Sequence, residues 1–253
     1  MQAISFRLSG KTACFRKPDV NQYAYFTYNN IHKPALLGLL GAVIGLGGHT
    51  QLYNENRGKK PNQLEYNQGY PEFYEKLQHL KVSIVPLAPH GYFSKKIQVF
   101  NNSVGYASFE AGGNLIVREQ WLENPAWQIL ILDNGSDMYA KIAEYLLHEK
   151  SVFIPYLGKN DHPAHIREVK TVALENGIEN IKISSLFDEQ DLHISEIAPR
   201  GELSFCFKEI SPIKLQKQYH FYEYKPLLFT NHKIDEGDYS FVFSNDGQNY
   251  AFI

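Results

Sequence analysis

The segment from His32 to Gly48 limits the possible folds of this chain more than any other, because it is apolar on nearly every side. Pro34 stands where the first residue of a helix would, and its fixed φ suits that position. The apolar stretch 35–46 therefore predicts a helix that is buried all round. A chain of 253 residues is long enough to form the core that such a helix needs.

Glycines interrupt this predicted helix at regular positions. Gly38, Gly41 and Gly45 fall on one stripe, although each glycine lowers helix stability. We expect the stripe to allow very close approach of a sheet or of a ligand backbone. Gly47 and Gly48 are predicted to end the helix and to allow a left-handed turn.

Charge is distributed unevenly along the chain. The net charge of −2 argues against a protein that coats nucleic acid generally. However, residues 1–60 hold eight Lys/Arg against two Asp/Glu, whereas residues 158–253 hold ten against fifteen. A local basic surface would hold phosphates. A chance separation of positive and negative residues among solvent-exposed faces explains the same counts equally well.

The pattern of apolar residues predicts a series of strands and helices. Strands are expected at 2–9, 82–87, 115–122, 127–132 and 152–156, and helices at 35–46, 70–80 and 137–149. The polar stretch 51–70 predicts a surface loop. Residues 91–114 are punctuated by Gly, Ser and Asn and predict a projecting arm.

This order predicts an α+β fold. Residues 1–157 are expected to form a ferredoxin-like βαββαβ domain, also described as RRM-like, with the arm at about 91–114. Residues 158–253 are expected to form a smaller β-rich C-terminal part, in which Asn245-Asp246-Gly247 predicts a hairpin turn. A four-stranded sheet of this kind is a platform for RNA in some proteins, but many such domains bind none.

Motifs for common enzyme chemistry are absent from the sequence. It contains no P-loop and no Gly-x-Ser-x-Gly elbow. His162 and His165 lie beside Asp161, but Pro163 separates them and no second pair matches. We therefore interpret them as loop histidines and expect no metal and no cofactor.

Metal-independent cleavage of RNA remains an alternative. It needs a general base for the 2′-hydroxyl and an acid for the leaving oxygen. Tyr53, His90, Lys95 and Lys96 are loop candidates, but nothing in their spacing marks them as a site. The non-catalytic interpretation is preferred, and no catalytic residue is assigned.

The remaining sequence features concern compartment. Cys14 and Cys206 form no metal spacing and are expected to be buried, reduced thiols. No signal peptide is recognised, and no apolar run reaches the roughly 18 residues of a membrane span. A cytoplasmic protein without membrane contact is expected.

Three segments, in order, resemble the fifth family of CRISPR-associated proteins, which belongs to the RAMP superfamily and occurs in type I Cascade. The first joins Ile4–Pro18, which contains Phe15-Arg16-Lys17-Pro18, to the glycine-rich helix at Pro34–Gly48. The second is Val117-Arg118-Glu119-Gln120-Trp121-Leu122, and the third runs from Phe153 to Pro163. Phe-Arg-Lys-Pro followed by His-Lys-Pro-Ala-Leu-Leu-Gly is most similar to type I-B members.

The resemblance implies a non-catalytic subunit that caps one end of Cascade and holds the 5′ handle of the guide RNA (crRNA). Its implied partners are crRNA, the Cascade backbone subunit and the large subunit, with target DNA met only through the complex. The arm would contact the adjacent backbone subunit.

The implied RNA contacts are of three kinds. Cations would meet phosphates, rings would stack on bases, and glycine backbone N–H groups would approach a phosphate. The residues are Lys11, Phe15, Arg16, Lys17, Tyr28, His32, Lys33, Gly45, Gly47, Gly48, Arg118 and Lys159.

Two alternatives stay open. In type I-C systems the related subunit is itself the endoribonuclease that matures the guide, but its catalytic Tyr, Lys and His have no matching positions here. A ferredoxin-like domain that binds a small molecule or a protein is the other alternative.

Overall fold

The protein is described by a computed structural model that covers residues 1–19, 23–56, 69–102, 109, 115–176, 182–197 and 199–253. Its main sheet contains four strands: β1 (Gln2–Ser9), β3 (Val82–Pro86), β6 (Ala126–Leu132) and β7 (His165–Ala173). They lie in the order β3-β6-β1-β7, and every neighbouring pair is antiparallel. The two central strands are therefore β6 and β1.

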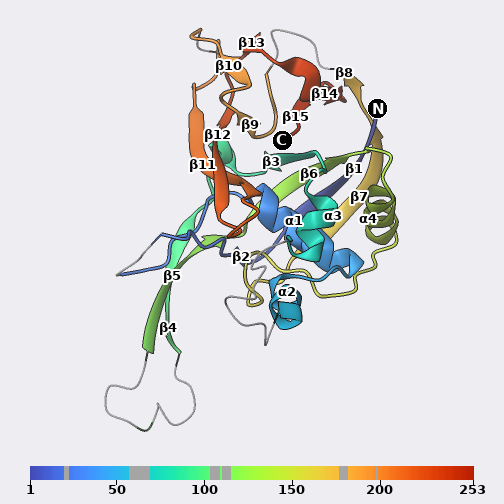
Figure 1. Ribbon diagram of the computed structural model, residues 1–253. Helices are drawn as coiled ribbons and strands as arrows, with labels where there is room; N and C mark the ends of the chain where they lie inside the picture. Colours follow the sequence, from blue (N-terminus) through green and yellow to red (C-terminus); the bar gives the residue numbers. More distant parts are fainter. Residues whose placement is uncertain (20–22, 57–68, 103–108, 110–114, 177–181, 198) are drawn as a thin grey trace.

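Four helices accompany the strands: α1 (Lys33–Ile44), α2 (His49–Asn56), α3 (Glu72–Leu77) and α4 (Asp137–Leu147). Figure 1 shows α1 and α3 lying across the main sheet, with α4 beside β7. The chain contains both helices and strands, so the prediction of a mixed α and β fold is confirmed.

The strict alternation of β1 separates two cores. Ile4, Phe6 and Leu8 point to the helices and join the largest apolar cluster. Ala3 points the other way, where Leu130 of β6 and Phe243 of the C-terminal part share a second cluster. The main sheet is thus covered on one face by helices and on part of the other by C-terminal strands.

Helix α1 ends earlier than its sequence pattern indicates. Gly45 has φ 82 and ψ 30, so it is the left-handed residue that ends the helix, rather than Gly47 or Gly48. The close neighbour of Gly38 and Gly41 is α3, because a Cβ at Gly41 would lie 2.6 Å from the Cβ of Phe73, whereas Gly45 faces Val152. The predicted sheet or ligand backbone does not occupy that place.

The predicted strand at 152–156 is wrong. The N–H groups of Val152 and Phe153 donate to the carbonyls of Val43 and Ala42 at the end of α1, at 2.9 and 3.1 Å. Pro155 has no N–H to offer a neighbouring strand. The fourth strand of the main sheet is β7, which begins at His165. The division at 157 stays a prediction, and β7 lies on its C-terminal side.

Of the arm predicted at about 91–114, residues 103–108 and 110–114 lie outside the described residues. The arm contains β4 (Lys95–Asn102), and the separately predicted strand 115–122 is β5 (Leu115–Glu123), which pairs with β4 in register from Lys95↔Leu122 to Asn102↔Leu115 and makes the arm a hairpin. It projects away from the body of the molecule (Figure 1). The short strand β2 (Thr12–Ala13) pairs with β5 at its base. The turn η1 (Pro89–Gly91) precedes β4.

The C-terminal part is built from strands in three small sheets. Its elements are β8 (Glu175–Asn176), β9 (Phe187–Asp188), β10 (Leu192–Ile194), β11 (Cys206–Leu215), β12 (Tyr222–Thr230), β13 (Ile234–Gly237), η3 (Tyr239–Phe241), β14 (Val242–Asn245) and β15 (Gln248–Ala251). The turn predicted at Asn245-Asp246-Gly247 joins β14 to β15, and Asp246 and Gly247 have positive φ.

Three smaller expectations concern a loop, the thiols and the membrane. The start of the predicted loop 51–70 is helix α2, and residues 57–68 lie outside the described residues. Both cysteines are free thiols, but only Cys14 is buried, whereas Cys206 is exposed. Among the described residues no single helix is long and apolar enough to span a membrane. Helices α1 and α2, bent by 75° at their break, qualify only as a pair.

Two glycines of α1 provide a matched test of its packing. We expect Gly41→Ala to lower the free energy of unfolding by about 1–3 kcal/mol, because the new Cβ would overlap the main-chain end of Phe73. We expect Gly38→Ala to raise it by up to about 1 kcal/mol, because its Cβ would lie 3.7 Å from the Phe73 ring. Urea denaturation measures both, and equal stabilities would contradict the assigned packing.

Candidate nucleic-acid interface

A groove of about 930 Å³ runs along α1 and collects several of the predicted site residues. Its floor is the side of α1 that includes Ala35, Gly38 and Ala42. The walls come from distant segments, including Cys14–Arg16, His49–Gln51, Glu119, Phe153, Ile154, Tyr156, Gly158–Lys159 and Tyr222. We call this cavity the helix groove. Of the predicted residues it contains Phe15, Arg16, His32, Gly48 and Lys159.

The loop before α1 is buried and polar. Asn29 donates from Nδ2 to the carbonyl of Gly91 at 2.7 Å and accepts from the N–H of Phe93 at 3.1 Å. Asn30 Oδ1 accepts from Trp127 Nε1 at 3.0 Å. The Glu209 carboxylate on β11 accepts from the N–H groups of Asn29 and Asn30, at 2.7 and 3.2 Å. This loop therefore joins the segment before the arm, the main sheet and the C-terminal part.

His32 is the N-cap of α1 rather than a surface ring. Its Nδ1 accepts from the N–H of Ala35 at 3.2 Å, which requires a neutral imidazole. Burial lowers the pKa of His32 from 6.5 to about 3. The ring packs edge-on against Phe15, Tyr28 and Tyr222.

The predicted stacking of bases on Phe15, Tyr28 and His32 is corrected by their burial. They are 2%, 3% and 3% exposed, respectively, and belong to the core. Phe15 packs edge-on against the fully buried Trp127, with ring centroids 5.9 Å apart. A ring that is already enclosed by protein offers no face to a base.

Lys33 is also a core residue in this structure. Its side chain is buried, and Nζ donates to the carbonyl of Ile253 at 3.1 Å. Burial, with the nearby charges of Lys81 and Lys214, lowers the pKa of Lys33 from 10.5 to about 8. Lys33 therefore ties the start of α1 to the C-terminal part and is not placed to meet a phosphate.

The backbone N–H groups at the end of α1 are already occupied. Gly47 donates to the Glu72 carboxylate at 2.7 Å, and Gly48 donates to Gln51 Oε1 at 3.0 Å. Hydrogen bonds from Lys76 and Gly47 lower the pKa of Glu72, so this carboxylate stays ionised. Gly45 faces Val152 instead of the groove. The predicted glycine nest for a phosphate is thus filled by a carboxylate and an amide of the chain itself.

Four predicted cations remain available at the base of the arm. Lys11, Arg16 and Arg118 are exposed, and Lys17 is half-buried. Among the residues that the structure describes, none of the four forms a salt bridge. The Arg16 guanidinium lies 3.2 Å from the centre of the Tyr25 ring, and Tyr25 donates its N–H to the carbonyl of Arg118 at 2.9 Å. Tyr25 therefore links the Arg16 side chain to the backbone of Arg118.

Lys159 is committed to a partly buried ion pair. Its Nζ donates to both Glu119 carboxylate oxygens, at 2.9 and 2.8 Å, and lies 3.6 Å from Asp161. Burial lowers the pKa of Lys159, but the hydrogen bond and charge of Glu119 raise it above its ordinary value overall. This pair holds β5 of the arm to the turn at 158–161, and its positive charge is already compensated.

Sequence reasoning missed two sets of groove residues. Phe153, Ile154 and Tyr156 are exposed and line the groove, although their sequence pattern predicts a strand. His49 also lines it, with its ring centroid 5.6 Å from that of His220, which is 171 positions away in sequence. Only the tertiary structure brings these two histidines together. Tyr53, His90, Lys95 and Lys96 lie on α2, η1 and β4 and do not line the groove.

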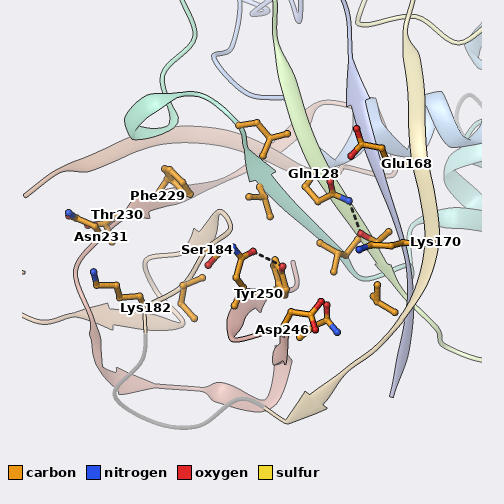
Figure 2. A pocket seen from close by; sticks show the side chains of 18 of the residues that line it. Gln128, Glu168, Lys170, Lys182, Ser184, Phe229, Thr230, Asn231, Asp246 and Tyr250 are labelled. Carbon is orange, nitrogen blue, oxygen red and sulfur yellow. Dashed lines mark hydrogen bonds between the residues drawn. The ribbon is translucent and has the colours of Figure 1, made fainter. Parts of the chain in front are cut away.

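A second cleft, of about 840 Å³, lies on the opposite face of the main sheet (Figure 2). Its walls include Gln128 of β6, Lys170 of β7 and Tyr250 of β15. Gln128 donates to Ser5 at 2.7 Å and Tyr250 to Gln248 at 2.8 Å, so much of its polar lining is already paired. The helix groove is therefore the stronger candidate for binding a ligand that carries negative charge and aromatic rings.

Comparison with solved structures identifies a protein that shares the fold of this chain. No family model and no curated protein matches the sequence. A crystal structure of a CRISPR protein from Archaeoglobus fulgidus matches with a TM-score of 0.52 at 9% identity, over 99% of this chain and 98% of that one. A chain of a CRISPR RNA-guided surveillance complex matches with a TM-score of 0.49 at 12% identity, over 92% and 91%. The match to the Archaeoglobus protein shows a common fold.

The N-cap histidine predicts a specific acid sensitivity. The folded pKa of His32 is about 3, against 6.5 when unfolded, so its contribution is complete above pH 6.5 and is lost as the pH falls toward 3. The difference between the folded and unfolded pKa corresponds to roughly 4–5 kcal/mol of unfolding free energy that is lost across this pH range. His32→Asn keeps a capping oxygen but does not titrate, so we expect a flatter decline in unfolding free energy over this range.

Urea unfolding at several pH values measures this difference in slope. His79→Asn replaces an exposed histidine and serves as the control, with the wild-type slope expected. An unchanged slope in His32→Asn would show that the cap does not depend on the neutral ring.

Proposed function

We propose that this chain is a non-catalytic RNA-binding subunit of a type I CRISPR Cascade complex. It holds the 5′ handle of crRNA in the helix groove and caps the backbone filament. The observation that carries the proposal is the groove itself, which is lined both by Arg16, a cation without a salt bridge to the described residues, and by exposed aromatic side chains. Single-stranded RNA is bound by this combination of cations and stacking faces.

The fold supports the same proposal. The topology β3-β6-β1-β7, with helical crossovers before β3 and β7, is that expected of a ferredoxin-like domain of the RAMP type. The fold is shared with a CRISPR protein of Archaeoglobus fulgidus. The three sequence segments that resemble type I-B members provide an independent line of support.

The partners follow from the proposed place in the complex. The β4–β5 arm projects from the body and would contact the neighbouring backbone subunit (Figure 1). The large subunit is the other proposed protein partner, and target DNA is met only through the assembled complex.

Cations at the arm base provide the test of RNA binding. We expect Arg16→Ala plus Lys17→Ala to weaken binding of repeat-derived single-stranded RNA by about a hundredfold, because each of the two deleted cations contributes about 1.4 kcal/mol, or about tenfold in affinity. The slope of log K against log salt should also become shallower, by about 0.7 for each phosphate that is no longer neutralised. Fluorescence anisotropy at several salt concentrations measures both quantities.

The matched control is Arg200→Ala plus Lys233→Ala, which removes two exposed cations from the C-terminal part. Wild-type affinity and slope are expected for it. Equal reductions of affinity in both double variants would indicate nonspecific electrostatics, and no preference of the wild type for repeat RNA over scrambled RNA would contradict the proposed function.

The second candidate is a metal-independent endoribonuclease that processes pre-crRNA. The pairing of the groove residue His49 with His220, which does not itself line the groove, favours it, because two imidazoles can serve as acid and base. We expect repeat RNA incubated with the protein and EDTA to stay intact on a denaturing gel. Discrete products that disappear in His49→Ala or His220→Ala would overturn the binding-only proposal.

A further inference from the structure

Three exposed apolar side chains line the helix groove from one short segment. Phe153, Ile154 and Tyr156 are 50%, 82% and 47% exposed, and all three belong to the groove wall. Large apolar side chains clustered on a surface mark a place of interaction. Two of the three are aromatic, so they also offer π-faces.

The backbone beneath these side chains is held firmly. Besides the bonds from Val152 and Phe153 to the end of α1, the Ser151 hydroxyl donates to the carbonyl of Phe153 at 2.5 Å. The carbonyl of Pro155 accepts from the N–H of Ala164 at 3.0 Å. A surface that is already ordered loses little conformational entropy when it binds a ligand.

The polar groups of the groove indicate how a nucleic acid strand would lie in it. At the Gly47–Gly48 end, the backbone N–H groups are occupied by Glu72 and Gln51, and the Glu72 charge repels phosphate. Arg16 is the groove cation that no described acidic side chain neutralises. Phosphates are therefore favoured near Arg16, which leaves bases to cover the apolar wall.

We propose that Phe153 and Tyr156 form an aromatic platform on which unpaired bases of single-stranded RNA stack. The platform takes the role that burial denies to Phe15, Tyr28 and His32. This inference rests on the proposed function, since it names side chains that would bind bases in the same groove. Stacking on rings tolerates any base, because every base has a π-face.

The first test compares side chains with and without a ring. We expect Phe153→Leu plus Tyr156→Leu, which keeps apolar area but removes the π-faces, to weaken binding of fluorescein-labelled repeat RNA about tenfold for each base that no longer stacks. Phe153→Tyr plus Tyr156→Phe should bind as the wild type does. The slope of log K against log salt should not change in either variant, because no phosphate-binding group is removed. The Arg16→Ala plus Lys17→Ala variant differs in this respect.

The second test removes the bases instead. RNA with abasic sites should bind the wild type as weakly as intact RNA binds the double-leucine variant, and the two changes together should weaken binding little further. Such a thermodynamic cycle reports a direct interaction between ring and base. A merely structural role of the rings would produce additive reductions of affinity.

The control is Tyr219→Leu plus Phe221→Leu, a stacked aromatic pair with centroids 5.6 Å apart that is exposed but does not line the groove. Wild-type affinity in the platform variant would overturn the platform and leave the proposed function standing. Unchanged RNA affinity with loss of Cascade assembly would identify the segment as a protein-docking surface and also overturn the inference. If the wild type itself does not prefer repeat RNA to scrambled RNA, the proposed function fails instead.

Discussion

The buried polar loop from Asn29 to Lys33 connects every major part of the molecule. Trp127 near the start of the central strand β6, Gly91 and Phe93 before the arm, and Glu209 on β11 all bond to Asn29 or Asn30. Polar groups that are removed from water are costly when unpaired, so each of these bonds constrains the position of its partner. The start of α1, and with it one end of the helix groove, is set by this loop.

This arrangement explains why the residues nearest α1 serve structure instead of binding. His32 must remain neutral to accept from Ala35, and Lys33 is bonded to a carbonyl of the C-terminal part. At the other end of α1, Gly47 is bonded to the Glu72 carboxylate. Both ends of the helix are thus closed by the protein's own groups, and the available chemistry lies along its side.

The available chemistry is divided between two groups of residues. Arg16 is stacked on Tyr25, whose backbone bonds to that of Arg118, and provides uncompensated positive charge where the arm leaves the body. The segment at 153–156 provides exposed rings on a backbone that is bonded to α1. Charge near one wall and aromatic faces on another suit a strand whose phosphates and bases point to different sides.

Local patterns in the sequence were sufficient for β1, α1, α3, α4 and the β14–β15 hairpin, because periodicity, an N-terminal proline and turn residues act over a few positions. They were not sufficient for 152–156, where a strand-like pattern is overridden by hydrogen bonds to α1. The type of a residue indicates what it can bind, but burial decides whether it can do so. Phe15, Tyr28 and His32 have the right rings but lie in the core, whereas Phe153 and Tyr156 line the groove because the chain returns to α1 more than a hundred residues later.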